Sequence, residues 1–329
     1  KKMSKSIVNV IVPEHVIKEY GADILRLWVA SSDYHSDIRI SKEILKQLSE
    51  VYRKIRNTAR FILGNIFDFN PNTDMVPYEN LEELDKWALY RLNNVIRRVK
   101  GFYDKYEFYN IFHTIHNFCV VDLSNFYLDI IKDRLYCEEK TGVKRRSAQT
   151  TMYIVLDTLT RLLAPILSFT AEEIWNAMPH VGEPLKSVFM TDMPNAEDKY
   201  DNIDVAKWEK IFNIREDVKK ALENARNEKL IGAALESKII LHCKTDELYN
   251  FLKDKLKELS VIFICSETEA VKDNADIGHI GENCEGLSVE VIKATGEKCE
   301  RCWIYSHTVG ENQEHKTLCS RCAEVVSKI

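Results

Sequence analysis

Two cysteine pairs near the end of this 329-residue chain place the tightest constraint on how it can fold. Cys299 and Cys302 form one C-x-x-C pair, Cys319 and Cys322 form a second, and 16 residues separate them. Each pair can place two sulfurs about 2.3 Å from one metal ion, so together they complete a tetrahedral site. Four protein ligands leave no position for a water molecule. We therefore predict one structural, non-catalytic Zn²⁺ per chain.

The alternatives for these cysteines are chance pairs or disulfides. The chain has nine cysteines, an odd number, and no signal-like start, which favours reduced thiols and a cytoplasmic location. Residues 296–329 include few large apolar side chains, so metal binding has to supply much of the folding free energy of this segment. The other five cysteines stand singly and are interpreted as small buried hydrophobes.

The middle of the chain has the apolar spacing of packed helices. Only 11 glycines and 7 prolines are present, which favours long helices over turn-rich β structure. One stripe advances mostly in steps of three and four, and consists of Phe108, Phe112, Ile115, Cys119, Phe126 and Ile130. We predict a mainly α fold with an antiparallel helical bundle at residues 41–200. Ser41 is expected to cap a helix from Lys42 to about Asn65.

The pattern changes after residue 200. We predict a long helix from Val205 to about Lys229, with Gly232 as its C-terminal glycine. The β-favouring runs 238–243, 261–265 and 287–291 are predicted to be strands of a small α/β unit, with a helical stretch near Asp246–Leu259. The predicted domains are therefore residues 1–40, a bundle at 41–200, a long helix with an α/β unit at 201–295, and a zinc finger at 296–329.

Charge limits the partners that this chain can attract. The net charge of −5 supplies no general attraction for nucleic acid, so RNA contacts would have to come from local basic patches. Two basic clusters are candidates, although each is first interpreted as a solvated face: Arg97, Arg98 and Lys100, then Lys140, Lys144, Arg145 and Arg146. His113 and His116 are interpreted as structural helix residues rather than catalysts. No apolar run reaches the roughly 18–20 residues of a membrane span, so no membrane partner is expected.

A lysine- and serine-rich pentapeptide, Lys2-Met3-Ser4-Lys5-Ser6, suits a polyphosphate because cations and hydroxyl donors can close on it together. Alone, it is equally consistent with a solvated basic loop. With Asn9, Pro13 and the segment 20–34 that follow, it resembles the KMSKS signature of class I aminoacyl-tRNA synthetases. The resemblance implies that Lys5 and Lys2 are catalytic, and that Met3, Ser4 and Ser6 complete an ATP-binding loop. Val8 stands where a glycine is common in that family.

Further resemblances point to one branch of these enzymes. Residues 110–119, 122–129, 132–136 and 215–232 resemble the isoleucyl-tRNA synthetases, and Lys298–Trp303 resembles the zinc finger that ends their bacterial type. This implies a stem-contact segment within residues 1–40 and an anticodon-binding bundle at 41–200. In the finger, Lys298, Arg301, Trp303 and Arg321 are then the candidate tRNA contacts. The alternative for Trp303 is that it only covers the zinc.

The resemblance implies the C-terminal portion of a ligase that joins isoleucine to tRNA(Ile) using ATP with Mg²⁺. No HIGH-type signature, nucleotide-binding sheet or editing insertion occurs in the sequence, so we expect this chain alone to be inactive, and we expect a monomer. Two alternatives stay open at this point: a valine–tRNA ligase, and a stand-alone tRNA-binding module without catalysis.

Overall fold

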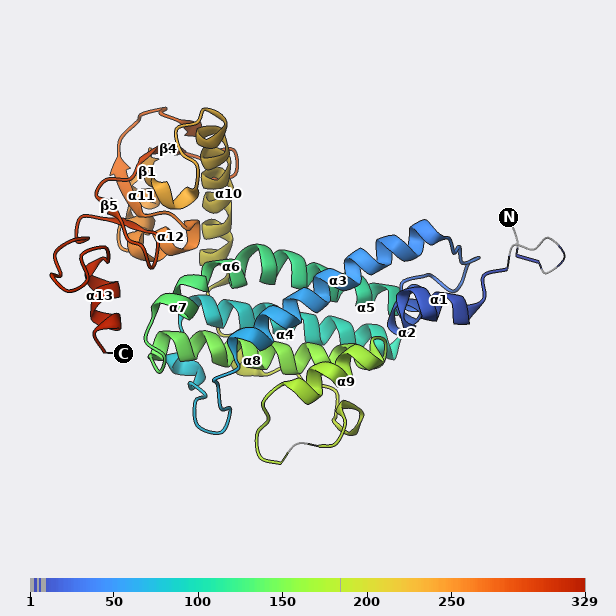
Figure 1. The fold of residues 1–329 in the computed structure, drawn as a ribbon. Coiled ribbons are helices and arrows are strands. Elements are labelled where there is room, and N and C mark those ends of the chain that lie inside the picture. The colour runs from blue at the N-terminus through green and yellow to red at the C-terminus, as the bar shows by residue number, and fades with distance from the viewer. Residues whose placement is uncertain (1–2, 5, 7–9, 184, 329) are drawn as a thin grey trace. The chain divides into compact units, whose positions relative to one another are not determined.

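The chain is mainly helical and divides into two compact units. In this computed structural model the described residues are 3–4, 6, 10–183 and 185–328. Unit 1 comprises residues 1–131 and 140–203, and unit 2 comprises residues 132–139 and 204–329 (Figure 1). The predicted mainly α fold with a small sheet is confirmed. Among the described residues, no helix is long and apolar enough to cross a membrane.

Unit 1 is built from helices. Its elements are α1 (Pro13–Tyr20), α2 (Ala22–Ala30), α3 (Lys42–Asn65), η2 (Tyr78–Asn80), α4 (Glu83–Asp104), α5 (Phe108–Asn117), η3 (Phe118–Tyr127), α6 (Leu128–Ile130), α8 (Val143–Leu163), α9 (Ser168–Ala177), η4 (Val188–Met190) and η5 (Asp198–Asp201).

The bundle helices begin and end at the residues that the sequence indicates. Ser41 caps α3 as predicted, since its Oγ accepts a hydrogen bond from the Ile44 N–H at 3.3 Å. Helix α8 ends at Leu163, two residues before Pro165. Helices α4 and α5 pack together and are joined by only three residues, so they run antiparallel.

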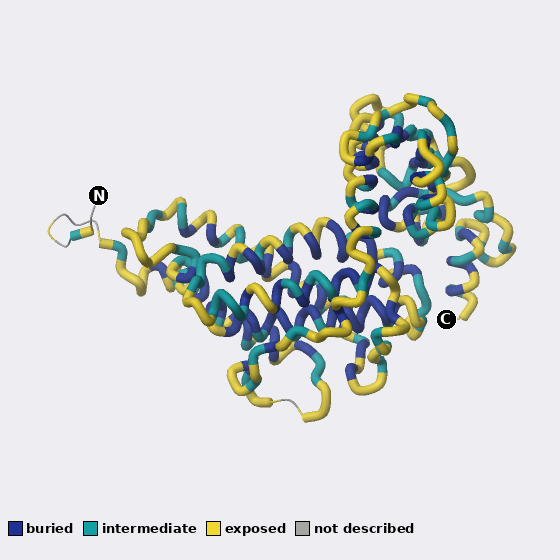
Figure 2. The backbone as a smooth tube through the Cα atoms, turned by 180° about the vertical axis from the view of Figure 1, so that it is seen from behind, coloured by how far each residue is buried: buried dark blue, intermediate teal, exposed yellow. Residues whose placement is uncertain are grey.

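A buried carboxylate fastens three of these elements. Asp85 of α4 is fully buried and accepts hydrogen bonds from the Tyr127 hydroxyl of η3 at 2.6 Å and from the Ser147 hydroxyl of α8 at 2.5 Å. A buried carboxylate is stable only when such donors satisfy it, so these bonds fix the order of the helices. Figure 2 shows the buried residues along the inner faces of the helices and the exposed ones on the loops.

One stretch of the bundle departs from the expected helix geometry. The stripe from Phe108 to Ile130 is buried except at the half-buried Phe108, as its spacing predicts. Its centre, however, is η3, a π-helical segment in which each turn is wider than in an α-helix. Such segments are rare and occur frequently at functional sites.

Unit 2 combines helices with a four-stranded sheet. Its elements are α7 (Lys132–Cys137), α10 (Val205–Asn227), η6 (Ala234–Glu236), β1 (Ser237–Cys243), α11 (Asp246–Leu252), α12 (Leu256–Phe263), β2 (Glu267–Lys272), β3 (His279–Ile280), β4 (Leu287–Lys293), β5 (Glu297–Lys298), β6 (Tyr305–Ser306) and α13 (Ser320–Val326). The sheet order is β2-β1-β4-β3, with β1 and β2 parallel and β4 antiparallel to both β1 and β3. Helices α11 and α12 form the crossover that a parallel pair requires.

Two predictions in this region were wrong. The run 261–265 is not a strand, because its first three residues complete α12 and Ile264 ends that helix in the left-handed conformation (φ 58°). Leu259, Ile262 and Phe263 are buried at helical spacing, and a short apolar run alone does not separate a strand from a buried helix. Gly232 does not end α10 either. Lys229 takes the left-handed conformation there (φ 58°), and the Leu230 N–H donates to the Ala225 carbonyl at 2.9 Å.

A second buried carboxylate joins α10 to the sheet. Asp217 is fully buried and accepts hydrogen bonds from the backbone N–H groups of Glu282, Asn283 and Cys284 at 2.9–3.1 Å. The last segment of the chain contacts the edge of this sheet. The Tyr305 N–H donates a hydrogen bond to the Oγ of Ser266, the residue just before β2, at 2.9 Å.

Candidate metal centre

Four buried sulfur atoms meet at the C-terminal end of unit 2. Cys299 directly follows β5, Cys319 is the residue just before α13, and Cys322 lies in the first turn of that helix. The Sγ atoms of Cys299, Cys302, Cys319 and Cys322 lie within 4.8 Å of one another. Zn–S bonds of about 2.3 Å in a tetrahedron set each S···S distance to about 3.8 Å. The Cys302 and Cys319 sulfurs are 3.8 Å apart, so the cluster fits a zinc ion.

The thiols of this cluster differ in acidity. Burial raises the pKa of Cys299, but hydrogen bonds from backbone N–H groups outweigh it and bring the pKa to about 6. One of these donors is the Cys319 N–H, 3.3 Å from the Cys299 Sγ. The pKa of Cys302 is raised, first by its hydrogen bond with Cys322 and then by burial. Without a cation, the neighbouring thiols oppose one another's ionisation. A divalent ion removes this repulsion, because all four sulfurs can then bind it as thiolates.

Two unusual backbone positions flank the first C-x-x-C pair, Cys299 and Cys302. Gly296 has a φ of 86°, and a Cβ there would lie 2.5 Å from the Ser306 carbonyl carbon, so only glycine fits beside β6. Trp303 has a φ of 64° and is 60% exposed. The partly buried apolar residues that pack against the cysteines are Ile304, Val309 and Leu318. The Lys298 ammonium lies 5.6 Å from the Trp303 ring centroid, and together these two residues form an exposed cationic and aromatic pair.

The finger is fastened to a segment more than 150 residues earlier in the chain. Arg321 forms two hydrogen bonds with the Asp133 carboxylate, at 2.6 and 2.7 Å, and its Nη1 lies 3.9 Å from Glu138. Lys328 pairs with Glu139 at 2.6 Å. The segment 132–139 therefore faces the finger with three carboxylates, and we call these contacts the α7 clasp. Paired, two-point Arg–carboxylate contacts are among the stronger ion pairs in proteins.

A fifth cysteine belongs to the same contact. Cys137 of α7 is buried in one cluster with the four candidate zinc ligands, and its Sγ lies 3.7 Å from the Arg301 carbonyl. The Arg301 guanidinium donates to the Tyr136 carbonyl at 3.4 Å. Of the four candidate tRNA contacts, Arg301 and Arg321 are therefore engaged with α7, whereas Lys298 and Trp303 are presented at the surface. The α7 clasp was not predicted, because Asp133 and Cys137 meet the finger only through contacts that span more than 150 residues of sequence.

The candidate ATP-binding loop is described only in part. Lys2, Lys5, Val8 and Asn9 lie outside the described residues. Met3 is 47% exposed, and the Ser4 and Ser6 hydroxyls are 2.7 Å apart.

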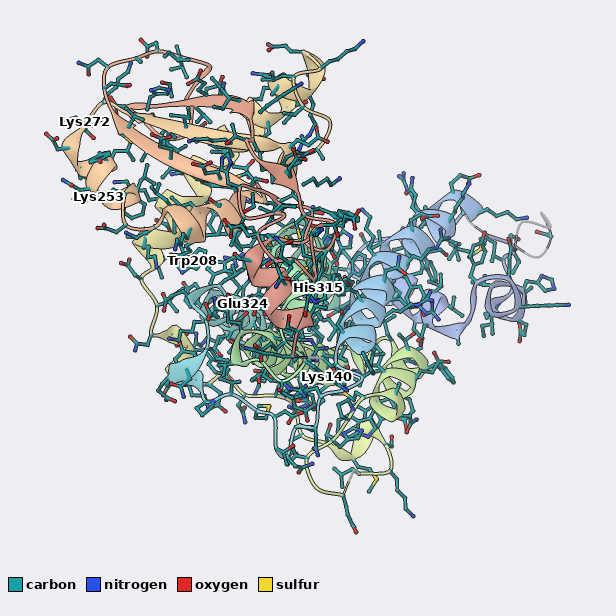
Figure 3. The ribbon with its side chains drawn as sticks, turned by 60° about the vertical axis from the view of Figure 1, so that its left-hand side comes forward. Lys140, Trp208, Lys253, Lys272, His315 and Glu324 are labelled. Carbon is teal, nitrogen blue, oxygen red and sulfur yellow. The ribbon has the colours of Figure 1, made fainter. Side chains whose placement is uncertain are left out.

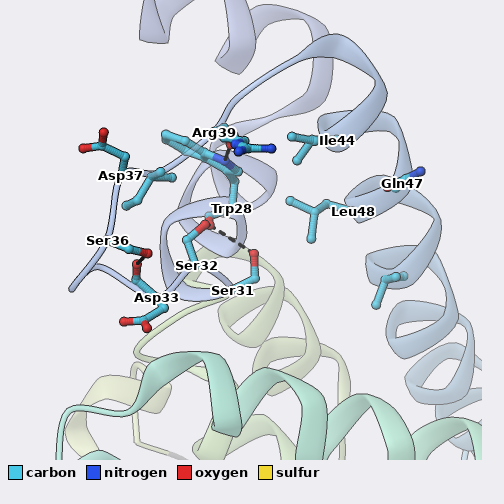
Figure 4. A pocket seen from close by; sticks show the side chains of 12 residues that line it. Trp28, Ser31, Ser32, Asp33, Ser36, Asp37, Arg39, Ile44, Gln47 and Leu48 are labelled. Atoms are coloured by element: carbon cyan, nitrogen blue, oxygen red, sulfur yellow. Dashed lines mark hydrogen bonds between the residues drawn. The ribbon is translucent and has the colours of Figure 1, made fainter. Parts of the chain in front are cut away.

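The segment after this loop folds over the start of α3. The Trp28 indole N–H donates to the Arg39 carbonyl at 3.0 Å, and the hydroxyls of Ser31 and Ser32 donate to the Trp28 carbonyl at 3.0 and 2.9 Å. These bonds shape a hollow of about 450 Å³ between the 28–39 turn and α3, with Asp33, Asp37 and Arg39 at its rim (Figure 4).

Most residues of the two basic clusters are engaged within the protein. Arg97 pairs with Asp201, Lys100 with Asn195, Arg145 with Asp68, and Arg146 with Asp74. The exposed side chains of Arg98, Lys140 and Lys144 have no hydrogen-bond or ion-pair partner in the part of the chain that the structure describes. The side chains of Arg145 and Arg146 are only 10% and 12% exposed, so the interpretation as a solvated face is wrong for these two residues. Arg97 forms its ion pair at the surface, with its side chain 43% exposed.

Three family models match parts of the chain. Residues 85–241 match the "Anticodon-binding domain of tRNA ligase", residues 1–41 match "tRNA synthetases class I (I, L, M and V)", and residues 296–325 match the "Zinc finger found in FPG and IleRS". An isoleucine–tRNA ligase from Caldanaerobacter subterraneus is 52% identical over 336 residues, which cover 100% of this chain and 35% of the relative. The chain is a homologue of the isoleucine–tRNA ligases.

Other relatives give the same result. The isoleucine–tRNA ligase of Syntrophotalea carbinolica is 52% identical over 99% of this chain, and that of Thermoanaerobacter sp. is 51% identical over 100%. The chain spans about a third (35%) of the length of these curated relatives. The match includes the finger, so the four cysteines and the bundle belong to one homologous region.

The ligand assignment predicts opposite effects on zinc content for substitutions of Cys302 and Cys137, two cysteines of the same cluster. Cys302→Ser should lose the zinc and unfold residues 296–329, because three thiolates hold zinc far less well than four. Cys137→Ala removes a sulfur of the same cluster but no ligand, so it should retain one zinc per chain. Metal analysis and hydrogen exchange of the purified variants measure both effects. Retention of a full equivalent of zinc by Cys302→Ser would contradict the ligand assignment.

Proposed function

We propose that this chain is the C-terminal portion of an isoleucine–tRNA ligase that binds tRNA(Ile) through its bundle and its zinc finger. The observation that carries the proposal is about 50% identity to isoleucine–tRNA ligases across the whole chain, with the four finger cysteines clustered for a metal. Around that metal, the exposed pair of Lys298 and Trp303 provides a cation for a phosphate and an aromatic face for an unstacked base.

The complete enzyme would activate isoleucine with ATP and Mg²⁺ and transfer it to tRNA(Ile) in the cytoplasm as a monomer. In this proposal Lys2, Met3, Ser4, Lys5 and Ser6 form the loop that holds the ATP phosphates. Lys5 and Lys2 stabilise the negative charge that develops on the leaving pyrophosphate. The residues that bind isoleucine and edit errors belong to other parts of such an enzyme, so we expect the present chain to bind tRNA without activating an amino acid.

The zinc in this proposal is structural. Cys299, Cys302, Cys319 and Cys322 would hold it, and the bound ion supplies folding free energy to the finger rather than chemistry to the substrate. Arg301 and Arg321 act indirectly, because their contacts with α7 orient the finger that presents Trp303.

The tRNA-binding role predicts a specific loss on truncation of Trp303. Trp303→Ala should weaken tRNA(Ile) binding roughly tenfold, the scale of one lost base–aromatic stack. Trp303→Phe should retain most of the affinity because it keeps an aromatic face. Phe67→Ala, which removes an aromatic side chain that is 79% exposed in unit 1, serves as the matched control and should change little.

Footprinting of the same complexes locates the contact. Protection of the anticodon arm of tRNA(Ile), with weaker protection of tRNA(Val), is the expected result. Equal binding of unrelated RNA of the same length would contradict the proposal.

The ATP-binding loop is testable in a complete enzyme. Lys5→Ala should slow isoleucine-dependent exchange of pyrophosphate into ATP by roughly 10²–10³-fold, the usual effect of removing one transition-state charge donor. Lys18→Ala, which removes an exposed cation of α1, should have little effect. A large loss of isoleucine binding in Lys5→Ala would instead indicate a structural role for Lys5.

A further inference from the structure

A polar hollow of about 340 Å³ lies on the surface of unit 1. Arg98 of α4 lines one side, and the other lining residues all come from α5: Asn110, His113, Thr114, His116 and Asn117. No carboxylate and no apolar side chain is among them. A second hollow of the same unit has a different character, since Leu25, Phe108 and Ile166 are among its lining residues. The hollow beside Arg98 is thus suited to a charged or strongly polar ligand.

Arg98 is the available cation at this hollow. Its neighbours in sequence are engaged, since Arg97 forms an ion pair with Asp201 and Lys100 a hydrogen bond with Asn195. The Arg98 side chain is exposed and has no partner among the described residues. A guanidinium carries five N–H donors in a planar fork, which matches two oxygens of one phosphate.

His116 presents an unpaired polar atom at the same hollow. Its Nε2 is buried and has no hydrogen-bond partner within the described protein. The ring is held in place because it stacks on Phe112, with the centroids 6.0 Å apart. Burial, followed by the charges of Lys54 and His113, lowers the pKa of His116, so the imidazole is neutral at neutral pH. Buried polar atoms nearly always have a partner, so this nitrogen is free to bind a ligand, and in the tautomer that carries its proton on Nε2 it donates to an acceptor.

The carboxylates near the hollow are already paired. Glu107 accepts a hydrogen bond from the Asn110 side chain at 2.9 Å. Asp122, within the π-helical η3 that directly follows Asn117, forms two hydrogen bonds with Arg91, at 3.1 and 3.2 Å. Arg91 neutralises Asp122, whereas the Asn110 amide that binds Glu107 is uncharged and leaves the Glu107 charge in place. Arg98 is the cation among the lining residues.

We propose that this hollow binds a backbone phosphate of the bound RNA. The Arg98 guanidinium pairs with two oxygens of the phosphate. His116, through its Nε2–H, donates to another acceptor of the phosphate, as do His113 and Asn117. The proposal rests on the tRNA-binding function proposed above and names one of its subsites. A phosphate suits this lining because the Arg98 guanidinium matches two phosphate oxygens and the other lining side chains are polar, with no tryptophan, tyrosine or phenylalanine among them. Phosphate contacts position a nucleic acid without reading its sequence. The subsite therefore sets affinity rather than the choice among tRNAs.

The test compares two variants with the same change in charge. Arg98→Ala in the full chain should weaken tRNA(Ile) binding roughly tenfold, the size of one charge-assisted contact, and lower the slope of log K against log salt by about 0.7–0.9. The same factor should apply to a non-cognate tRNA. Lys253→Ala, which removes an exposed cation that follows α11 (Figure 3), should change affinity less than twofold. Asn117→Asp, which places a negative charge in the hollow, should weaken binding at least as much as Arg98→Ala.

Histidine NMR separates an RNA phosphate from a free anion. With ¹⁵N-labelled histidine, tRNA(Ile) should shift the His116 Nε2 signal in the wild-type chain and not in Arg98→Ala. Inorganic phosphate at millimolar concentration should produce at most a weak shift. If the wild-type chain binds tRNA(Ile) while Arg98→Ala binds it with unchanged affinity and salt slope, the subsite is wrong. Tight phosphate binding that does not compete with RNA would also overturn it. If the wild-type chain binds no tRNA at all, it is the proposed function that fails.

Discussion

Four thiols packed within 4.8 Å of one another cannot all ionise unless a cation lies between them. This electrostatic constraint governs the C-terminal segment. Backbone N–H groups lower the pKa of Cys299, whereas its neighbours Cys302 and Cys322 have raised pKa values. A zinc ion converts the cluster from four competing thiols to four bound thiolates, and its binding free energy then becomes folding free energy for the finger.

The cysteine cluster brings together two segments that are distant in the sequence. One segment contains the two C-x-x-C pairs. The other is residues 132–139, which include Asp133, Cys137 and Glu139. Arg301 and Arg321, which belong to the two C-x-x-C pairs, point toward α7, whereas Trp303 lies at the surface with Lys298 beside it. Arg301 and Arg321 therefore bind the finger to α7, whereas Trp303 and Lys298 stay exposed at its surface.

Local sequence signals predicted much of this structure. The Ser41 cap, the ends of α3 and the start of α10, and the clustering of the four cysteines depend on neighbours in sequence or on metal-ligand spacing. The run 261–265 was misassigned because an apolar segment of five residues has no period long enough to distinguish a strand from a buried helix. The pairing of Arg321 with Asp133 spans 188 residues, and no local pattern encodes it. The unpaired His116 nitrogen likewise depends on how its ring packs against Phe112, which no local sequence pattern predicts.

Hydrogen exchange of the full chain before and after zinc removal tests the central claim most directly. If the metal holds the two C-x-x-C pairs and α7 together, chelation should raise exchange in residues 132–139 together with residues 296–329, while α3 and α8 stay protected. Restoring zinc should restore protection in both segments. Unchanged protection of residues 132–139 while residues 296–329 unfold would contradict the account, because the α7 clasp would then form without the metal.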